Sequence, residues 1–372
     1  MQTNRAWGDK MKERSALRPS IYCGLLLLLV LAITLLVNNK PIGYSKNALF
    51  QTLQPKILLE VQGDLAWAGG DSYYNYSDGS LKMMEETGKV LWDTKIKGQL
   101  LWIGEEGVIA AQDNMLLMLD GNGHEIFQKA DLPDKPRVLC VQGKYLLLSG
   151  KLSGVEHGIL LHDRGDIVWQ IPLDGSIISG SLHPKGIYAV FSVIDNDAKS
   201  RLVVVGPRGD ILIDSGHQLP LYRIRAVSQG ICVITADRAY LMDYDGRLLW
   251  EYGFQGQVLR GDIGSDGSVA AIVEEHAGSL SQDLHQVLIM LSEQGRHICS
   301  YSLDSRPNNV KVDKDRVYIV DDYGIMLLSR EGLLLSKITQ RGIKKLTFTD
   351  KNNIIVNLEA SSLLLESPTG GI

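Results

Sequence analysis

A short motif returns seven times along this chain of 372 residues: a few aliphatics, a polar turn that ends in glycine, then more aliphatics, often followed by tryptophan. The positions four residues before and three residues after the glycine are apolar in every copy. A repeat of about 40 residues built from hairpins indicates β-units that stack and bury their faces against their neighbours. The turn glycines are Gly88, Gly123, Gly165, Gly209, Gly246, Gly295 and Gly332.

Each unit divides into four short strands separated by Gly, Asp, Asn or Ser. The fifth unit is predicted to contain strands at Tyr222–Val227, Ile231–Thr235, Ala239–Asp243 and Arg247–Tyr252. The turn between the third and fourth strands ends in glycine, which supplies the positive φ that a tight hairpin needs. We expect the aliphatics on both sides of this turn to fill the space between adjacent sheets.

The two ends of the repeat region predict how the fold closes. Three strands, at Lys344–Thr349, Asn353–Leu358 and Ser362–Leu365, follow the last complete unit without a fourth. A lone strand at Ile57–Val61 precedes the first unit. Pairing it with the final three completes a ring without open edges. We therefore expect an all-β, eight-bladed β-propeller of four-stranded blades, with seven blades as the alternative and an open β-solenoid as a more distant one.

The N-terminal region has a different character. An uncharged apolar run, Ile21–Val37, is at the short end of what spans a bilayer, and basic residues outnumber acidic ones before it. A cleaved signal peptide is the alternative, but no small-x-small pair follows the run, and Cys23 lies too early for a lipoprotein cysteine. The predicted organisation is a cytoplasmic tail at 1–20, a transmembrane helix at 21–37, a linker at 38–55 and an extracytoplasmic propeller at 56–372 of a bacterial cell-membrane protein.

Charge and cysteine content narrow the class of partner. The net charge is −5, and removing the basic tail makes the remainder more acidic. Nucleic-acid binding is therefore not expected, because it needs Lys and Arg to displace counterions. Cys140, Cys232 and Cys299 lie in apolar surroundings, which favours buried thiols over a disulfide framework.

The segments Thr87-Gly88-Lys89-Val90-Leu91-Trp92 and Gly246-Arg247-Leu248-Leu249-Trp250 resemble the repeat of pyrroloquinoline-quinone-type propellers. The resemblance implies that the aromatic after each turn docks on the next blade. The aromatics in this column are Trp92, Phe127, Trp169 and Trp250. Quinoprotein dehydrogenases add a cofactor pocket and often a vicinal disulfide. This chain has no adjacent cysteines and matches none of the cofactor ligands, so the resemblance implies the fold without a cofactor. It is closer in kind to non-enzymatic, membrane-anchored bacterial propellers, such as those that scaffold outer-membrane protein assembly.

No catalytic constellation and no metal-ligand spacing stands out. Asp120–Glu125 places oxygens at alternating positions, as a Ca²⁺ loop would, but it falls on a repeat hairpin, where an ordinary turn is favoured. Asp195-Asn196-Asp197 lacks the glycine and distal glutamate of an EF-hand and is interpreted as a loop. We therefore predict no metal site.

Three units are lengthened between their second and third strands, at Gly150–His157, Asp195–Ser200 and Glu274–His285. In a propeller these connections share a face with the links between blades. Insertions on one face often mark a binding surface, although drift in a surface loop is the alternative. The candidate interaction residues are Ser153, Glu156, His157, Asp195, Asn196, Asp197, Glu274, Glu275, His276, Asp283 and His285.

Three functions compete. The first is a non-catalytic binding or scaffold module for envelope or membrane proteins, held at the cytoplasmic membrane by one helix. The second is an enzyme, either a glycan hydrolase or a divergent quinoprotein, which predicts two convergent carboxylates or a polar cofactor pocket near the central channel. The third is a sensor that signals through its single helix, for which a tail of about 20 residues leaves no output domain. The sequence names no small-molecule ligand.

Overall fold

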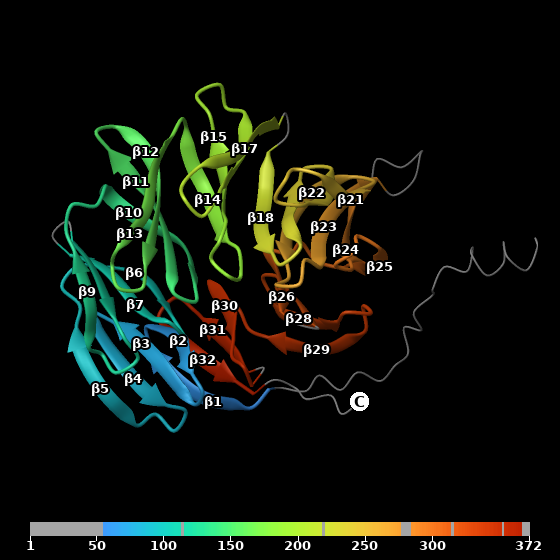
Figure 1. The fold of residues 1–372 in the computed structure, drawn as a ribbon. Helices are drawn as coiled ribbons and strands as arrows, with labels where there is room; N and C mark the ends of the chain where they lie inside the picture. Colours follow the sequence, from blue (N-terminus) through green and yellow to red (C-terminus); the bar gives the residue numbers. More distant parts are fainter. Residues whose placement is uncertain are drawn as a thin grey trace, which may run out of the picture. The chain divides into compact units, whose positions relative to one another are not determined.

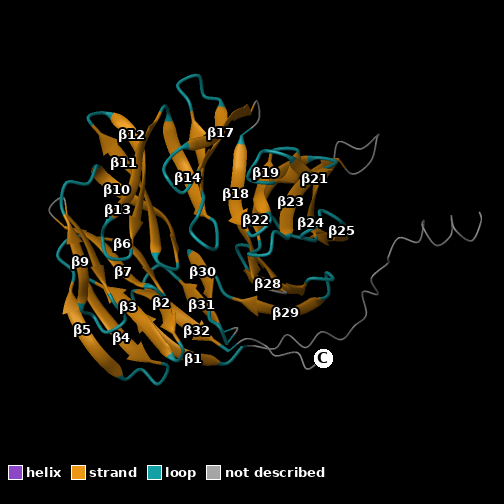
Figure 2. Cartoon of the chain, in the orientation of Figure 1, coloured by secondary structure: helices purple, strands orange, loops and turns teal. Residues whose placement is uncertain are grey.

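The computed structural model describes residues 55–112, 115–217, 220–276, 284–313, 316–351 and 353–366. All regular structure in these ranges is β-strand (Figure 2). The tail at 1–20, the apolar run at 21–37 and nearly all of the linker at 38–55 lie outside them. Among the described residues, no helix is long and apolar enough to cross a bilayer.

The strands form eight antiparallel sheets of four, which follow one another around a ring (Figure 1). We number these sheets as blades 1 to 8 and give their strands from the inner to the outer edge. Blade 1 contains β2 (Asp64–Gly69), β3 (Ser72–Ser77), β4 (Ser80–Glu85) and β5 (Val90–Lys95). Blade 2 contains β6 (Gln99–Gly104), β7 (Gly107–Gln112), β8 (Met115–Leu119) and β9 (Glu125–Lys129). Blade 3 contains β10 (Asp134–Gln142), β11 (Tyr145–Leu152), β12 (Val155–His162) and β13 (Ile167–Leu173). Blade 4 contains β14 (Ser176–Leu182), β15 (Ala189–Ile194), β16 (Ser200–Val205) and β17 (Ile211–His217).

The second half of the ring repeats this arrangement. Blade 5 contains β18 (Leu221–Val227), β19 (Gly230–Thr235), β20 (Arg238–Met242) and β21 (Leu248–Gly253). Blade 6 contains β22 (Gln257–Ile263), β23 (Val269–His276), β24 (Leu284–Leu291) and β25 (His297–Leu303). Blade 7 contains β26 (Asn309–Asp313), β27 (Arg316–Val320), β28 (Gly324–Ser329) and β29 (Leu334–Thr339). Blade 8 contains β30 (Lys345–Phe348), β31 (Ile354–Asn357), β32 (Ser361–Leu365) and, from the other end of the chain, β1 (Ile57–Gln62).

The strand β1 closes the ring. It pairs antiparallel with β32, from Ile57 opposite Leu365 to Gln62 opposite Ser361. A buried amide joins blade 8 to blade 1, because Asn357 accepts from Leu65 N at 3.0 Å and donates to Leu65 O at 3.1 Å. The prediction of eight four-stranded blades closed by a lone early strand is confirmed, and the seven-bladed alternative is wrong.

The hydrophobic core is divided among the blades. Eight clusters of buried residues occur in the described part of the chain, each between two neighbouring blades. The cluster between blades 5 and 6, for example, packs Cys232 and Ile234 against Val258 and Val273. The apolar column four residues before the turn glycine belongs to these clusters or packs against them, as with Leu161 and Leu291. Each blade therefore depends on both neighbours for burial.

The apolar column three residues after the turn glycine was expected to fill the same space, and this prediction is wrong. Six of its seven members, from Leu91 to Leu335, are exposed. In each of these seven blades the column residue is the extra residue of a β-bulge in the outer strand; Met83 pairs with Trp92 and Met84 with Val90, so Leu91 has no partner. In six blades the bulge turns the aliphatic side chain away from the inter-blade core, whereas Ile298 of blade 6 packs against the cluster between blades 6 and 7. The bulges also interrupt the pairing of the outer strands.

Candidate functional site

The links between blades and the connections between second and third strands lie on one face of the ring, here called the link face. Backbone bonds join the two kinds of segment: Ile96 N donates to Gly79 O at 2.9 Å, and Phe254 N donates to Asp237 O at 2.8 Å. The three lengthened connections belong to blades 3, 4 and 6 and emerge here.

The lengthened part of blade 3 is mostly strand. Only Ser153 and Gly154 form the turn between β11 and β12, and Ser153 has a φ of 50°. Glu156 lies within β12 and is 6% exposed, with its Oε1 at 2.9 Å from Arg137 Nη2 of β10. His157, also in β12, places Nδ1 3.0 Å from Val155 O. The sequence analysis placed Glu156 in a loop. It lies instead in a strand, where it is a buried ion-pair partner.

The connection in blade 4 is a compact turn. Asp195 Oδ1 accepts from Asp197 N at 3.0 Å and from Lys199 N at 2.8 Å, which satisfies the carboxylate locally. Asn196 reaches Asp174, in the link from blade 3, with its Nδ2 3.4 Å from Asp174 Oδ1. Blades 3 and 4 therefore share a small polar surface at this point of the link face.

The connection in blade 6 extends the hairpin between β23 and β24. Glu274 and Glu275 lie in β23, and His285 lies in β24 with its Nε2 4.0 Å from Glu275 Oε2. His276 ends β23, but its side chain, like Asp283, lies outside the described residues. Because blade 5 separates this hairpin from blades 3 and 4, the three lengthened connections form two separate regions of the link face.

The opposite face carries the glycine turns and is here called the turn face. Asp120 Oδ1 accepts from Asn122 N at 2.8 Å and from His124 N at 2.9 Å, and Asp243 makes the same pair of bonds with Asp245 and Arg247. This repeated side-chain cap explains the acidic residue at the start of the turn as a structural feature. Among the described residues, no group of three or more His, Cys, Asp or Glu side chains is placed to hold a metal ion.

The aromatic column docks on the glycine turn of the next blade. Trp92 donates from Nε1 to Gly121 O at 3.0 Å, and Trp250 donates to Glu293 O at 2.9 Å. A Cβ on Gly165 would lie 2.8 Å from Phe127 Cγ, and one on Gly209 would lie 2.9 Å from Trp169 Cβ. Glycine is needed at these turns because the neighbouring ring occupies the place of a side chain.

Inner strands β10, β14 and β18 line a cavity of about 670 Å³ in the central channel. Val138, Leu139 and Cys140 of β10 contribute to the lining and also pack against the inter-blade clusters, whereas the wall formed by β18 carries Arg223 and Arg225. The exposed side chains of Ile178 and Tyr222 also line it. A volume of this size is typical of small-molecule sites. No carboxylate is among its lining residues.

A single buried carboxylate organises the positive wall. Asp262 of β22 is 3% exposed; its Oδ1 lies 2.9 Å from Arg223 Nη2 and its Oδ2 lies 3.9 Å from Lys311 Nζ of β26. The backbone N of Val312 donates to the same Oδ2 at 3.1 Å. Burial lowers the pKa of Lys311; Asp262 opposes this shift, and Arg223, Arg225 and Lys345 add to it.

The sequence interpretation did not select these channel residues, because Arg223, Asp262 and Lys311 come from three different blades. A signal was present in the repeat itself. Where the inner strands of blades 1 and 2 read Leu65-Ala66-Trp67 and Leu100-Leu101-Trp102, those of blades 5 and 6 carry Arg223, Arg225, Arg260 and Asp262. Charged residues at inner-strand positions indicate a polar stretch of channel wall.

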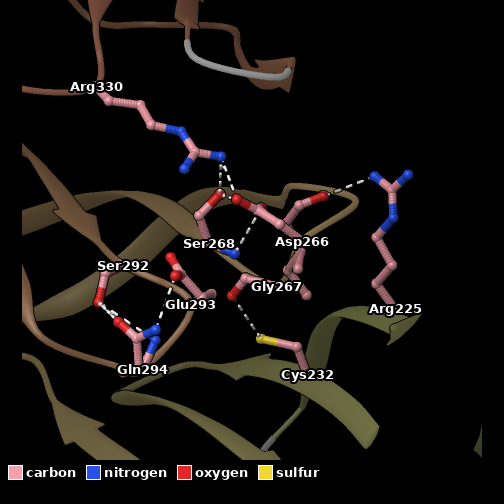
Figure 3. A network of polar contacts seen from close by, with 10 residues as sticks. Arg225, Cys232, Asp266, Gly267, Ser268, Ser292, Glu293, Gln294 and Arg330 are labelled. Carbon is pink, nitrogen blue, oxygen red and sulfur yellow. Dashed lines mark hydrogen bonds and ion pairs between the residues drawn. The ribbon is translucent and has the colours of Figure 1, made fainter. Parts of the chain in front are cut away.

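On the turn face, a polar network joins blades 5, 6 and 7 (Figure 3). Arg330, in the glycine turn of blade 7, contacts Asp266 in the turn between β22 and β23. Asp266 Oδ1 also accepts from Ser268 N at 3.0 Å, and Cys232 Sγ lies 3.7 Å from Gly267 O. Arg225 donates from Nη1 to Ile263 O at 2.7 Å, which places the channel arginine beside this network.

Comparison with known proteins identifies the fold. BamB from Moraxella catarrhalis is similar over 84% of this chain and 99% of its own, with a TM-score of 0.59 at 12% identity. The WD40 domain of SCAP from fission yeast is similar over 85% of this chain and 98% of its own, with a TM-score of 0.52 at 9% identity.

The fold is that of a β-propeller. A eukaryotic initiation factor is also similar, over 82% of this chain and 84% of its own, with a TM-score of 0.55 at 8% identity. No family model matches the sequence, and no curated protein matches it. At these identities the likeness concerns the arrangement of blades and no particular function.

Proposed function

We propose that this protein is a membrane-anchored, extracytoplasmic propeller that binds a partner protein of the cell envelope without catalysing a reaction. The observation that carries the proposal is a set of exposed aliphatics at the outer strands, here called the outer aliphatic band. Each member has between 37% and 54% of its surface exposed. The members are Val90, Leu91, Ile126, Ile167, Val168, Ile211, Leu212, Leu248, Leu249, Leu333 and Leu335.

Folding does not account for this band. A side chain at a bulge in an outer strand is free to be polar, and charged residues there protect an edge better. The chain instead keeps an aliphatic in all seven turn-containing blades. Exposed apolar side chains that lie together are typical of surfaces that bind other proteins, and four blades expose two of them at consecutive positions. Because the bulges interrupt the ladder, we expect the partner to pack on side chains and not to add a strand to the sheet.

Substitution within the band tests this function. In membranes of the source organism, chemical crosslinking of the full chain is expected to give a reproducible envelope-protein adduct. The double change Leu212→Ser and Leu249→Ser should abolish that adduct while the thermal midpoint of the purified protein stays unchanged. Ile187→Ser removes an equally exposed aliphatic from the turn between β14 and β15 and should leave the adduct intact. An adduct that survives the double change contradicts the proposal.

The anchor is a separate part of the proposal and is supported by the apolar run at 21–37 and its basic flank. Alkaline phosphatase fused after residue 372 is expected to be active and β-galactosidase at the same position inactive. The opposite pattern contradicts an extracytoplasmic propeller. A mature chain that lacks its first 37 residues by mass would instead identify a cleaved signal peptide.

We also propose that the repeat is of the pyrroloquinoline-quinone type. The support is the docking of Trp92 and Trp250 on the glycine turns of the following blades, through bonds from indole Nε1 to backbone carbonyls. Purified protein incubated with the quinone is expected to bind none, because the ligand residues of that family have no counterpart here. A stoichiometric quinone complex, detected by absorbance after gel filtration, would favour the enzyme alternative.

A further inference from the structure

The channel cavity has two chemically different walls. The exposed side chains of Ile178 and Tyr222 form the apolar side. Arg223 and Arg225 of β18 form the basic side. A purely polar ligand makes no contact with the apolar side, and a purely apolar ligand leaves the arginines of the basic side without an anionic partner. A ligand that satisfies both walls carries an anionic group and an apolar body.

The basic side carries more positive charge than its carboxylate balances. Arg223 and Lys311 both contact Asp262, and Arg225 lies close enough to lower the pKa of Lys311 further. Two cations thus contact one carboxylate, and Arg225 and Lys345 add to the positive field. This surplus lies within a chain whose net charge is −5, so the remaining surface does not attract anions.

The arginine donors are also oriented for a ligand. The backbone carbonyl of Ile263 holds Arg225 through Nη1, at 2.7 Å. Within the described residues no hydrogen bond is made by its Nη2 or Nε. A guanidinium fixed at one nitrogen presents its other donors with little loss of side-chain entropy, which favours a charge-assisted bond to phosphate or carboxylate oxygens.

We propose that the central channel binds a small amphiphilic anion, with its phosphate or carboxylate at Arg223 and Arg225 and its apolar chain against Ile178 and Tyr222. This site is distinct from the outer aliphatic band, so a protein partner and the anion do not compete for the same residues. The inference stands or fails independently of the proposed function.

Equilibrium binding of radiolabelled octyl phosphate to the full chain in phosphatidylcholine nanodiscs tests the site, with empty discs subtracted. Saturable binding with one site per chain is expected. Arg225→Gln should weaken it about tenfold, the effect of losing one charge-assisted hydrogen bond. Arg260→Gln is the matched control, because Arg260 is on the next inner strand, bonds the carbonyls of Asn308 and Leu259, and does not line the cavity.

Competing ligands test the basic side, the apolar side and the two possible head groups one at a time. Octanoate should displace octyl phosphate, and the tighter of the two identifies whether the head group is a carboxylate or a phosphate. Octyl glucoside, which has the same chain without charge, should not compete, and inorganic phosphate should bind at least about tenfold more weakly. Equal binding by octyl glucoside or by inorganic phosphate overturns the proposal.

A second variant tests the site if the first one does not fold. If Arg225→Gln does not fold, as shown by its thermal midpoint, Ile178→Ser replaces it, because Ile178 lines the cavity mouth and is exposed. That change should weaken octyl phosphate and leave inorganic phosphate unaffected. Binding that is the same in Arg225→Gln, Arg260→Gln and the unaltered chain, or no binding at all, overturns the assignment.

Discussion

The indole of Trp250, on β21 of blade 5, lies against Gly295 in the glycine turn of blade 6. Its Nε1 donates to Glu293 O at 2.9 Å, and a Cβ built on Gly295 would lie 2.5 Å from the indole Cδ2. The φ of Gly295 is 72°, so a side chain here faces both backbone strain and a steric clash. The contact joins one blade to the next at the rim of the turn face.

Gly295→Ala is expected to lower the free energy of unfolding by about 3 kcal/mol, the sum of a left-handed alanine and an overpacked aromatic contact. Denaturant titration of the purified protein measures it. Gly143→Ala is the matched control, because Gly143 has a φ of 56° with nothing within 4 Å of its Cβ position. Gly143→Ala should lower the free energy of unfolding by about 1 kcal/mol. Equal losses in the two variants would show that backbone strain alone decides the effect.

Removal of β1 is expected to destabilise the whole ring. A chain that starts at residue 51 keeps β1, and one that starts at residue 63 leaves β32 with an unpaired edge. Loss of Leu58, Leu59 and Val61 from the closing cluster should lower the thermal midpoint by at least about 5 °C. The shorter chain should also self-associate in light scattering, because an open strand edge is exposed. Identical midpoints and monodisperse scattering would contradict closure by β1.

Iodoacetamide is expected to modify Cys140 before the other two described cysteines. Cys140 lines the channel cavity, Cys232 is fully buried, and burial raises the pKa of the Cys299 thiol to about 11. Burial also raises the pKa of Cys140, so less thiolate is present at pH 8 and its alkylation rate should keep rising as the pH increases. Peptide mass spectrometry over a time course measures the order. Cys232 or Cys299 reacting as fast as Cys140 in the folded protein would contradict it.

The contact between Asp266 and Arg330 is expected to make stability depend on acid pH. Burial alone would raise the pKa of Asp266, but hydrogen bonds from Ser268 and the Arg330 guanidinium lower it below its usual range. A lowered folded-state pKa stabilises the fold above the unfolded value of about 3.9, and the effect is lost as pH falls through the folded pKa.

Asp266→Asn should therefore cost about 1 kcal/mol at pH 7, because the pair is partly exposed, and almost nothing at a pH below the lowered folded-state pKa of Asp266. Unfolding titrations at the two pH values measure the difference. Asp245→Asn, at an exposed turn position, controls for the loss of charge. A cost for Asp266→Asn that does not change with pH would contradict the assignment.

The repeat predicts most of the fold because its signals are local. In the fifth unit the predicted strand ends differ from the observed ones by at most one residue, since glycine and polar turns limit each strand. The pairing of β1 with β32 was also predicted, because each blade needs four strands and the final unit shows three.

The exposed bulge at Leu91 and its equivalents was not predicted. Alternation along a strand assumes an unbroken register, and a bulge shifts the register by one residue without a composition signal. The channel site was missed for a different reason. Arg223, Asp262 and Lys311 are brought together only by the stacking of blades 5, 6 and 7, and no sequence spacing between blades reports this contact.

The union of β1 with β32 has a consequence for synthesis. Ile57 of β1 lies opposite Leu365 of β32, at the other end of the repeat region. The ribosome makes β1 first, yet its hydrogen-bonding partner is among the last strands to emerge. Blades 2 to 7 can assemble in order, each on its predecessor, while the earliest strand waits unpaired. The final step is therefore cooperative, since it completes blade 8 and covers the exposed flank of blade 1 together.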